Sequence, residues 1–148
     1  FAAVSTLEAM AYNVTAYDCV VCAAMDARCN QVYVALFRVN GGKVERLTEE
    51  ECLKTDEAAR MLSEYDDDIM LVGDGAFIMK KATDNEGLEN VKIAPDPLRY
   101  QTGYGVCLAA VNAPQLTPEQ LMPMYLKLPQ AQRELMAKNA EAYKERKE

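Results

Sequence analysis

The sequence lacks histidine altogether, and it lacks long apolar runs. Without histidine, the chain cannot build the Ser-His-Asp or Cys-His arrangements of nucleophilic catalysis, or a histidine-ligated zinc site. No apolar run reaches the ~18 residues that a membrane helix requires, and no signal peptide is recognisable. A P-loop and a GxGxxG segment are also missing, so neither of these phosphate-binding motifs is encoded.

Positive charge is scarce as well. The chain has 16 Lys and Arg against 23 Asp and Glu, which gives a net charge of −7. An acidic domain repels phosphate backbones, and a protein that binds nucleic acid by itself usually carries a basic patch. The basic residues near the C-terminus alternate with glutamates, which is typical of a solvated helical tail. We therefore expect no direct contact with nucleic acid, and a charged helical tail over residues 129–148.

The five cysteines show no spacing that suggests a disulfide framework. An odd number of thiols without such a framework indicates reduced cysteines and a cytoplasmic protein. Cys19 and Cys22 have CxxC spacing, but they lie in the apolar run CVVCAAM, which predicts a buried strand. Residues three apart on a strand point to opposite faces, so we expect neither a shared metal nor a disulfide.

The three consecutive aspartates, Asp66, Asp67 and Asp68, suggest a cation site at first sight. A calcium loop alternates its ligands with spacers and closes with Gly and Glu, which this run does not. We interpret the run as a charged loop and assign no metal ligands.

Hydrophobic periodicity predicts alternating helices and strands. Ser5 and Glu8 match a capping box at the start of a helix whose apolar face continues to Val14. Strands are expected over 19–25 and 31–38, and the short polar link between them predicts an antiparallel hairpin. Further strands are expected over 43–47, 51–54, 69–72 and 91–94, and helices over 56–65, 76–81 and 101–112. The last helix carries Tyr104, Cys107, Leu108 and Val111 at helical spacing.

The tripeptide Gly73-Asp74-Gly75 joins a predicted strand to a predicted helix. This geometry can hold a phosphate at the N-terminus of the helix. However, Asp74 would place a carboxylate beside that phosphate, and a tight turn that only Gly fits explains the same residues. We favour the structural turn and keep phosphate binding as the alternative. The mixture of elements around one sheet indicates an α/β or α+β class.

Several local patterns, taken together, resemble the TsaB family, also called YeaZ. The resemblance covers the whole chain in the family's order, through residues 4–10, 26–28, 31–33, 71–76, 123–127 and 129–131. It implies an α/β fold, namely the second lobe of a reduced actin/Hsp70-like (ribonuclease H-like) protein with a mixed sheet and an antiparallel hairpin flanked by helices. That lobe would occupy residues 1–128, and the charged tail residues 129–148.

The resemblance also implies a role and partners. TsaB-like proteins are non-catalytic scaffolds for TsaD, which transfers threonylcarbamoyl to a tRNA adenosine next to the anticodon, and they work with the ATPase TsaE. The family's first lobe, with its Gly-rich segment, has no counterpart here, and the chain begins Phe-Ala-Ala-Val. We therefore expect a fragment that lacks the first lobe and with it the main surface for the TsaD-like partner.

No catalytic, cofactor-binding or metal-binding residue is assigned from this resemblance. Asp26 and Arg28 match the family hairpin, where a turn bond or an ion pair is their expected role. Two alternatives stay open at this point. The chain could be a nucleotide-binding lobe of an actin/Hsp70/sugar-kinase-like ATPase, or a standalone interaction domain unrelated to tRNA.

Overall fold

Two long neighbouring strands form the centre of the sheet in the computed structural model, which describes residues 1–127. β1 (Cys19–Asp26) is buried from Cys19 to Ala24, and it pairs antiparallel with β2 (Gln31–Asn40) along its whole length. The predicted strands and their hairpin are therefore confirmed. β2 runs two residues beyond the expected end, because Val39 still pairs with Cys19 at the far end of the ladder.

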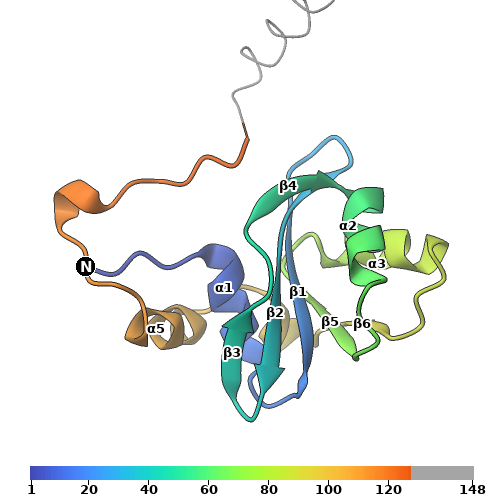
Figure 1. Ribbon diagram of the computed structural model, residues 1–148, viewed down its shortest axis with the longest axis horizontal. Helices are drawn as coiled ribbons and strands as arrows, with labels where there is room; N and C mark the ends of the chain where they lie inside the picture. Colours follow the sequence, from blue (N-terminus) through green and yellow to red (C-terminus); the bar gives the residue numbers. More distant parts are fainter. Residues whose placement is uncertain (128–148) are drawn as a thin grey trace, which may run out of the picture.

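The other strands extend the sheet on both sides of this hairpin (Figure 1). The order is β3-β2-β1-β5-β6, and β4 also pairs with β2. The pairs β1–β5 and β5–β6 are parallel, whereas β3 and β4 run antiparallel to β2. The expected mixed sheet with an antiparallel hairpin is thus present. The four outer strands are β3 (Lys43–Arg46), β4 (Glu51–Lys54), β5 (Ile69–Val72) and β6 (Val91–Ile93).

Helix α1 (Thr6–Ala11) begins as the sequence predicts, but its capping differs. The Ser5 hydroxyl accepts a hydrogen bond from the backbone N–H of Glu8 at 3.2 Å. The Glu8 side chain does not complete the capping box; its carboxylate accepts a hydrogen bond from Arg46 of β3 at 2.7 Å. A tertiary ion pair therefore takes the place of a local backbone bond. A short 3₁₀ helix, η1 (Tyr12–Val14), follows α1.

Helices α2 (Thr55–Leu62) and α3 (Ala76–Asn85) cover the face of the sheet opposite α1. α2 begins one residue before the expected start, because the Glu57 carboxylate accepts a hydrogen bond from the backbone N–H of Lys54 at 3.2 Å. α3 extends beyond the expected end at residue 81. The remaining helical elements are α4 (Asp96–Arg99), α5 (Gly103–Val111) and η2 (Pro118–Gln120).

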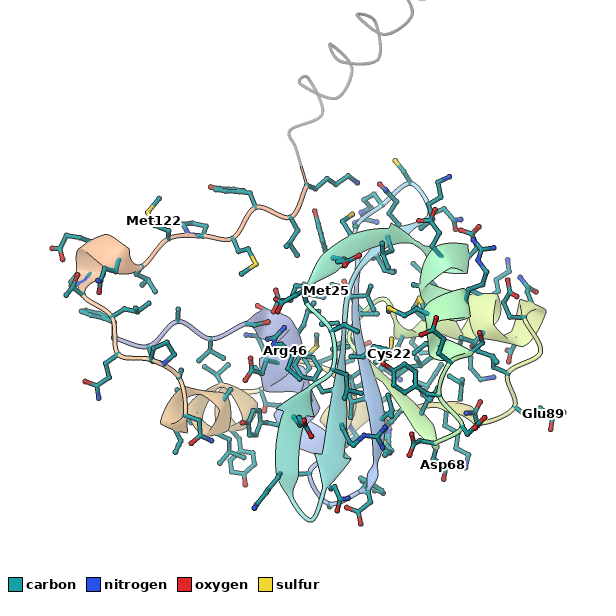
Figure 2. All side chains as sticks on the ribbon, in the orientation of Figure 1. Cys22, Met25, Arg46, Asp68, Glu89 and Met122 are labelled. Carbon is teal, nitrogen blue, oxygen red and sulfur yellow. The ribbon has the colours of Figure 1, made fainter. Side chains whose placement is uncertain are left out.

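Hydrophobic side chains gather in two cores, one on each face of the sheet. Cys22 lies in the core beneath α2 and α3, and Cys19 lies in the core beneath α1. The prediction that the two thiols of the CxxC run point to opposite faces is confirmed. Burial raises the pKa of the Cys22 thiol to about 12. Figure 2 shows Cys22 in the interior, while Met122 lies far out on the C-terminal segment.

Helix α5 lies beside α1 rather than on the sheet. Gly105 packs so closely on α1 that a Cβ atom there would lie 2.3 Å from the backbone oxygen of Ala9. Two of its large side chains are exposed, Tyr104 at 68% and Val111 at 76%. No helix described within residues 1–127 is long and apolar enough to cross a membrane. The predicted tail over 129–148, and the family-like residues 129–131, lie outside the described residues.

Candidate functional site

The carboxyl ends of β1 and β5 bring together the two loops that the sequence singled out. Because the two strands are parallel neighbours, they end at the same edge of the sheet. The loop that follows β1 contains Asp26 and Arg28, and the turn that follows β5 is Gly73-Asp74-Gly75. In open α/β sheets, this edge is where ligands usually bind. The two motifs therefore form the first candidate site.

The Gly73-Asp74-Gly75 turn is packed tightly against β1. Gly73 has φ 95°, and a Cβ atom there would lie 2.0 Å from the carbonyl oxygen of Ala24. The backbone N–H of Gly75 donates to that same oxygen at 3.0 Å. Only glycine can occupy position 73, since any side chain would collide with the backbone of the neighbouring strand. The geometry agrees with the structural turn favoured from the sequence.

The carboxylate of Asp74 ties this turn to the neighbouring loop. Its Oδ1 accepts a hydrogen bond from the backbone N–H of Asp26 at 3.1 Å. The N-terminus of α3 directly follows the turn, so a phosphate approaching that helix would meet the negative charge of Asp74. Charge repulsion at this position therefore opposes the phosphate-binding alternative.

Asp26 also holds the conformation of its own loop. Its two carboxylate oxygens accept hydrogen bonds from Arg28, at 2.7 Å from the backbone N–H and at 3.4 Å from Nη1. Three successive residues in this loop, Arg28, Cys29 and Asn30, have φ of 63°, 53° and 57°. Asn adopts this left-handed conformation readily, whereas Arg and Cys do so at a cost that neighbouring hydrogen bonds must offset. The turn bond and ion pair expected for Asp26 and Arg28 are both present.

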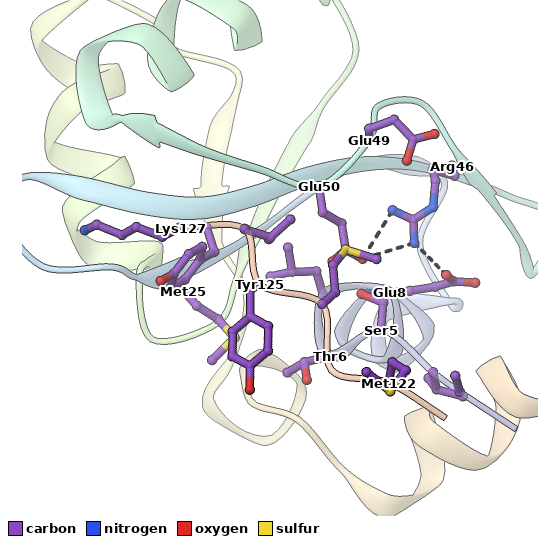
Figure 3. A pocket seen from close by; sticks show the side chains of 16 residues that line it. Ser5, Thr6, Glu8, Met25, Arg46, Glu49, Glu50, Met122, Tyr125 and Lys127 are labelled. Carbon is purple, nitrogen blue, oxygen red and sulfur yellow. Dashed lines mark hydrogen bonds and ion pairs between the residues drawn. The ribbon is translucent and has the colours of Figure 1, made fainter. Parts of the chain in front are cut away.

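A second candidate site is a groove of about 700 Å³ on the α1 side of the molecule (Figure 3). Its walls come from four places: the start of α1, the β1–β2 hairpin, the region around β3, and residues 121–127, which we call the C-terminal strap. Sequence patterns did not reveal this groove, since no single segment contains more than a small part of it. The lining side chains that matter below are Glu8, Met25, Tyr33, Arg46, Glu49, Glu50 and those of the strap.

Arg46 organises the charged end of the groove. Its Nη2 lies 2.7 Å from the Glu8 carboxylate and 3.3 Å from that of Glu50, and the guanidinium stacks over Phe37 at 4.9 Å. Partial burial opposes the charge, but the hydrogen bond to Glu8 and the neighbouring Glu50 raise the pKa of Arg46 above its ordinary value. This end of the groove is therefore fixed in place by ion pairs.

In the acidic run at Asp66, Asp67 and Asp68, the last two residues contact basic side chains. Asp67 forms a two-pronged ion pair with Arg38, with N–O distances of 2.9 and 3.0 Å. Asp68 lies 3.9 Å from the Lys92 ammonium. Within residues 1–127, no group of three or more potential ligand side chains is arranged to hold a metal ion. The charged-loop interpretation accounts for these contacts.

Comparison with known proteins gives a matching family model and similar solved structures. Residues 1–142 match a family model described as TsaD: tRNA N6-adenosine threonylcarbamoyltransferase. The structure is similar to the crystal structure of an uncharacterized protein with similarity to peptidase YEAZ from Pseudomonas aeruginosa, with a TM-score of 0.61 and 18% sequence identity. The match covers 84% of this chain and 57% of that chain, so this chain spans little more than half of that relative's length. No curated protein sequence matches the chain.

Proposed function

The chain belongs to the family of tRNA N6-adenosine threonylcarbamoyltransferase (TsaD) proteins, and from this premise we propose that it is a non-catalytic subunit. It serves as the scaffold partner of a TsaD-like transferase in threonylcarbamoyl modification of the tRNA adenosine next to the anticodon. A TsaE-like ATPase is the further partner in this proposal, and the complex is cytoplasmic. The family match and the YeaZ-like fold agree with the resemblance to TsaB, including its actin/Hsp70-like fold class.

One observation is the main support for a scaffold role. At the edge of the sheet where a nucleotide would bind in a two-lobed ATPase, the Gly73-Asp74-Gly75 turn is closed against Ala24 by a backbone hydrogen bond of 3.0 Å. The same turn presents the carboxylate of Asp74, which is bonded to the backbone of Asp26. A closed turn with a negative charge supports a structural role better than the binding of phosphates.

The overall charge supports a partner-based role as well. With a net charge of −7, the chain is poorly suited to approach tRNA by itself. In the proposed complex, the transferase holds the tRNA and performs the chemistry, and this chain contributes protein contacts.

A threonylcarbamoyl-transfer assay tests this proposal. The transferase from the same organism is incubated with tRNA, ATP and a pre-formed activated threonylcarbamoyl donor labelled in its threonine, alone, with this chain, or with the product of the gene that encodes it. We expect no transfer by this chain alone, and higher transfer when the transferase and the gene product are combined. A pull-down with the same proteins shows whether residues 1–148 suffice for binding. Transfer by the chain alone, or a gene product that neither binds nor stimulates the transferase, would overturn the proposal.

The alternative is a nucleotide-binding lobe, which the strand, Gly-rich turn and α3 helix favour by their order along the chain. A ligand that binds only the native state raises the melting temperature. We expect ATP with Mg²⁺ to leave the melting temperature unchanged, for the wild-type chain and for Asp74→Asn alike. A rise that Asp74→Asn increases would instead favour nucleotide binding at this turn.

A further inference from the structure

The C-terminal strap runs beside the groove without filling it. Met122, Met124 and Tyr125 are 76%, 71% and 86% exposed, although two of the three are methionines and the third is aromatic. Lys127 attaches the end of the strap to the loop after β1, because its ammonium donates a hydrogen bond to the carbonyl oxygen of Ala27 at 2.9 Å. Exposed methionines are common at surfaces that bind peptides, because their flexible side chains adapt to different shapes.

Backbone groups along the groove are also available for pairing. The strap follows an extended course (Figure 1), and within residues 1–127 the backbone N–H groups of Met122, Met124 and Tyr125 have no hydrogen-bond partner. The same holds, within that range, for the N–H of Val4 across the groove. Extended segments with free backbone groups can pair with an added strand, as in peptide-binding domains that extend a β-sheet.

The charges of the groove differ from one end to the other. Glu8, Glu49 and Glu50 surround Arg46 at one end, whereas Lys127 and Met25 lie at the other (Figure 3). Arg46 pairs with Glu8 and Glu50, but within residues 1–127 Glu49 takes part in no ion pair. The first end therefore carries excess negative charge, and a basic side chain would complement it.

From these features, we propose that the groove is a docking site for an extended peptide segment of a partner protein. The segment carries apolar side chains, which pack on Met25 and Tyr33, and a lysine or arginine that reaches Glu49. Its backbone pairs with the strap. The acidic net charge of −7 favours such a basic partner over a second copy of this chain, which would bring like charge to the same surface. This inference goes beyond the proposed function and does not depend on it.

The test uses a defined probe, the fluorescein-labelled peptide Val-Thr-Val-Thr-Val-Lys, and the complete 148-residue chain. Fluorescence anisotropy gives the dissociation constant. We expect binding that weakens about tenfold when the peptide's lysine is replaced by glutamate, a change of about 1.4 kcal/mol. A peptide with the same side chains but N-methylated backbone amides cannot pair with the strap, and we expect it not to bind.

Two charge-reversal variants separate the groove from the rest of the surface. Glu49→Lys should weaken binding of the lysine peptide about tenfold and strengthen binding of the glutamate peptide. Glu64→Lys makes the same change in net charge at an exposed position of the turn after α2 and should leave both affinities unchanged.

Three results of the binding measurements would overturn the proposal. They are no binding of the lysine peptide to the wild-type chain, equal weakening by the two variants, and undiminished binding of the N-methylated peptide. A photoreactive form of the probe should attach to residues that line the groove, such as Met25, Met122 or Met124, and attachment outside the groove would also overturn it. If sedimentation shows a dimer that the probe cannot dissociate and that Glu49→Lys breaks, the occupant is a second copy and the partner assignment is wrong.

Discussion

The two faces of the sheet are covered by helices in different ways. On one face, Ala58 and Leu62 of α2 and Met79 of α3 lie in the core, while the charged residues of both helices stay outside it. On the other face, Leu7 and Met10 of α1 lie in the core, but α5 buries only the small residues Gly105 and Ala109 and exposes Tyr104 and Val111. Among the large apolar residues of α2 and α3 only Phe77 is exposed, whereas α5 exposes Tyr104 and Val111.

This difference shows that helical periodicity can identify a helix such as α5, but it does not tell which side of that helix packs against the rest of the protein. Residues 100–118 contain no charged side chain, although 26% of the chain is charged. A helix that is apolar all round is usually buried on all sides. The α1 side, which also contains the groove, is therefore the side of the molecule best suited to contacts with other proteins.

The largest expected effect is a difference in reaction rate between two cysteines, one buried beneath the α2 and α3 face and one exposed on α5. Cys22 is fully buried under α2 and α3, whereas Cys107 is exposed on α5. The thiolate is the reactive form, and burial raises the pKa of Cys22 to about 12. We expect Cys22 to react with iodoacetamide at least about a thousandfold more slowly than Cys107, because its reaction requires opening of the core. A mass-spectrometric time course on the native protein checks this, and similar rates would contradict the buried assignment.

Truncating one apolar side chain on each helix should give the next largest difference. Leu62→Ala removes a fully buried side chain of α2 and should lower the free energy of unfolding by about 2–5 kcal/mol. Val111→Ala, on the exposed side of α5, should change it by less than about 0.5 kcal/mol. Urea denaturation of both variants measures the difference. If Val111→Ala proved equally costly, α5 would have to be covered in solution.

A glycine pair on α5 tests how this helix is attached. Gly105→Ala places a Cβ atom 2.3 Å from the Ala9 backbone oxygen, so α1 and α5 must move apart. We expect a loss of about 1–3 kcal/mol of stability. Gly103→Ala, in the same helix with nothing within 4 Å, should be neutral or stabilise by up to about 1 kcal/mol. Equal effects in thermal unfolding would mean that close packing of α5 on α1 is not required.

The smallest expected effect concerns the exposed ion pair between Arg38 and Asp67, at the margin of the α2 and α3 face. The Arg38 guanidinium holds the pKa of the Asp67 carboxyl below its ordinary value. Its contribution to stability is therefore present above the unfolded-state pKa of about 3.9 and is lost as the pH falls through the lower folded-state pKa. Asp67→Asn should lower Tm by no more than a few degrees at neutral pH.

The same variant should show a weaker loss of stability on acidification between about pH 4 and pH 2, since it no longer has this carboxyl to protonate. Acid titrations of wild type and Asp67→Asn, followed by circular dichroism, measure the difference. Identical titration curves would mean that the pair contributes nothing in solution.

Local patterns predicted most elements of the fold, because each depends on neighbours in the chain. The alternating and continuous apolar runs located the strands, and the Ser5 hydroxyl caps α1 as expected. The capping box failed at Glu8 for a tertiary reason, since Arg46 comes from a strand far along the sequence. At the sheet edge, the sequence identified Gly73 as a tight turn but could not show that Ala24 makes glycine necessary there.

By itself, the sequence determined the order of the elements, the opposite placement of Cys19 and Cys22, and the resemblance to a known family. These follow from side-chain periodicity and from short motifs, which are properties of adjacent residues. Only the tertiary structure decided which side of α5 is exposed and that four distant segments enclose a groove. Those features depend on how elements far apart in the sequence pack together, and no local pattern encodes that packing.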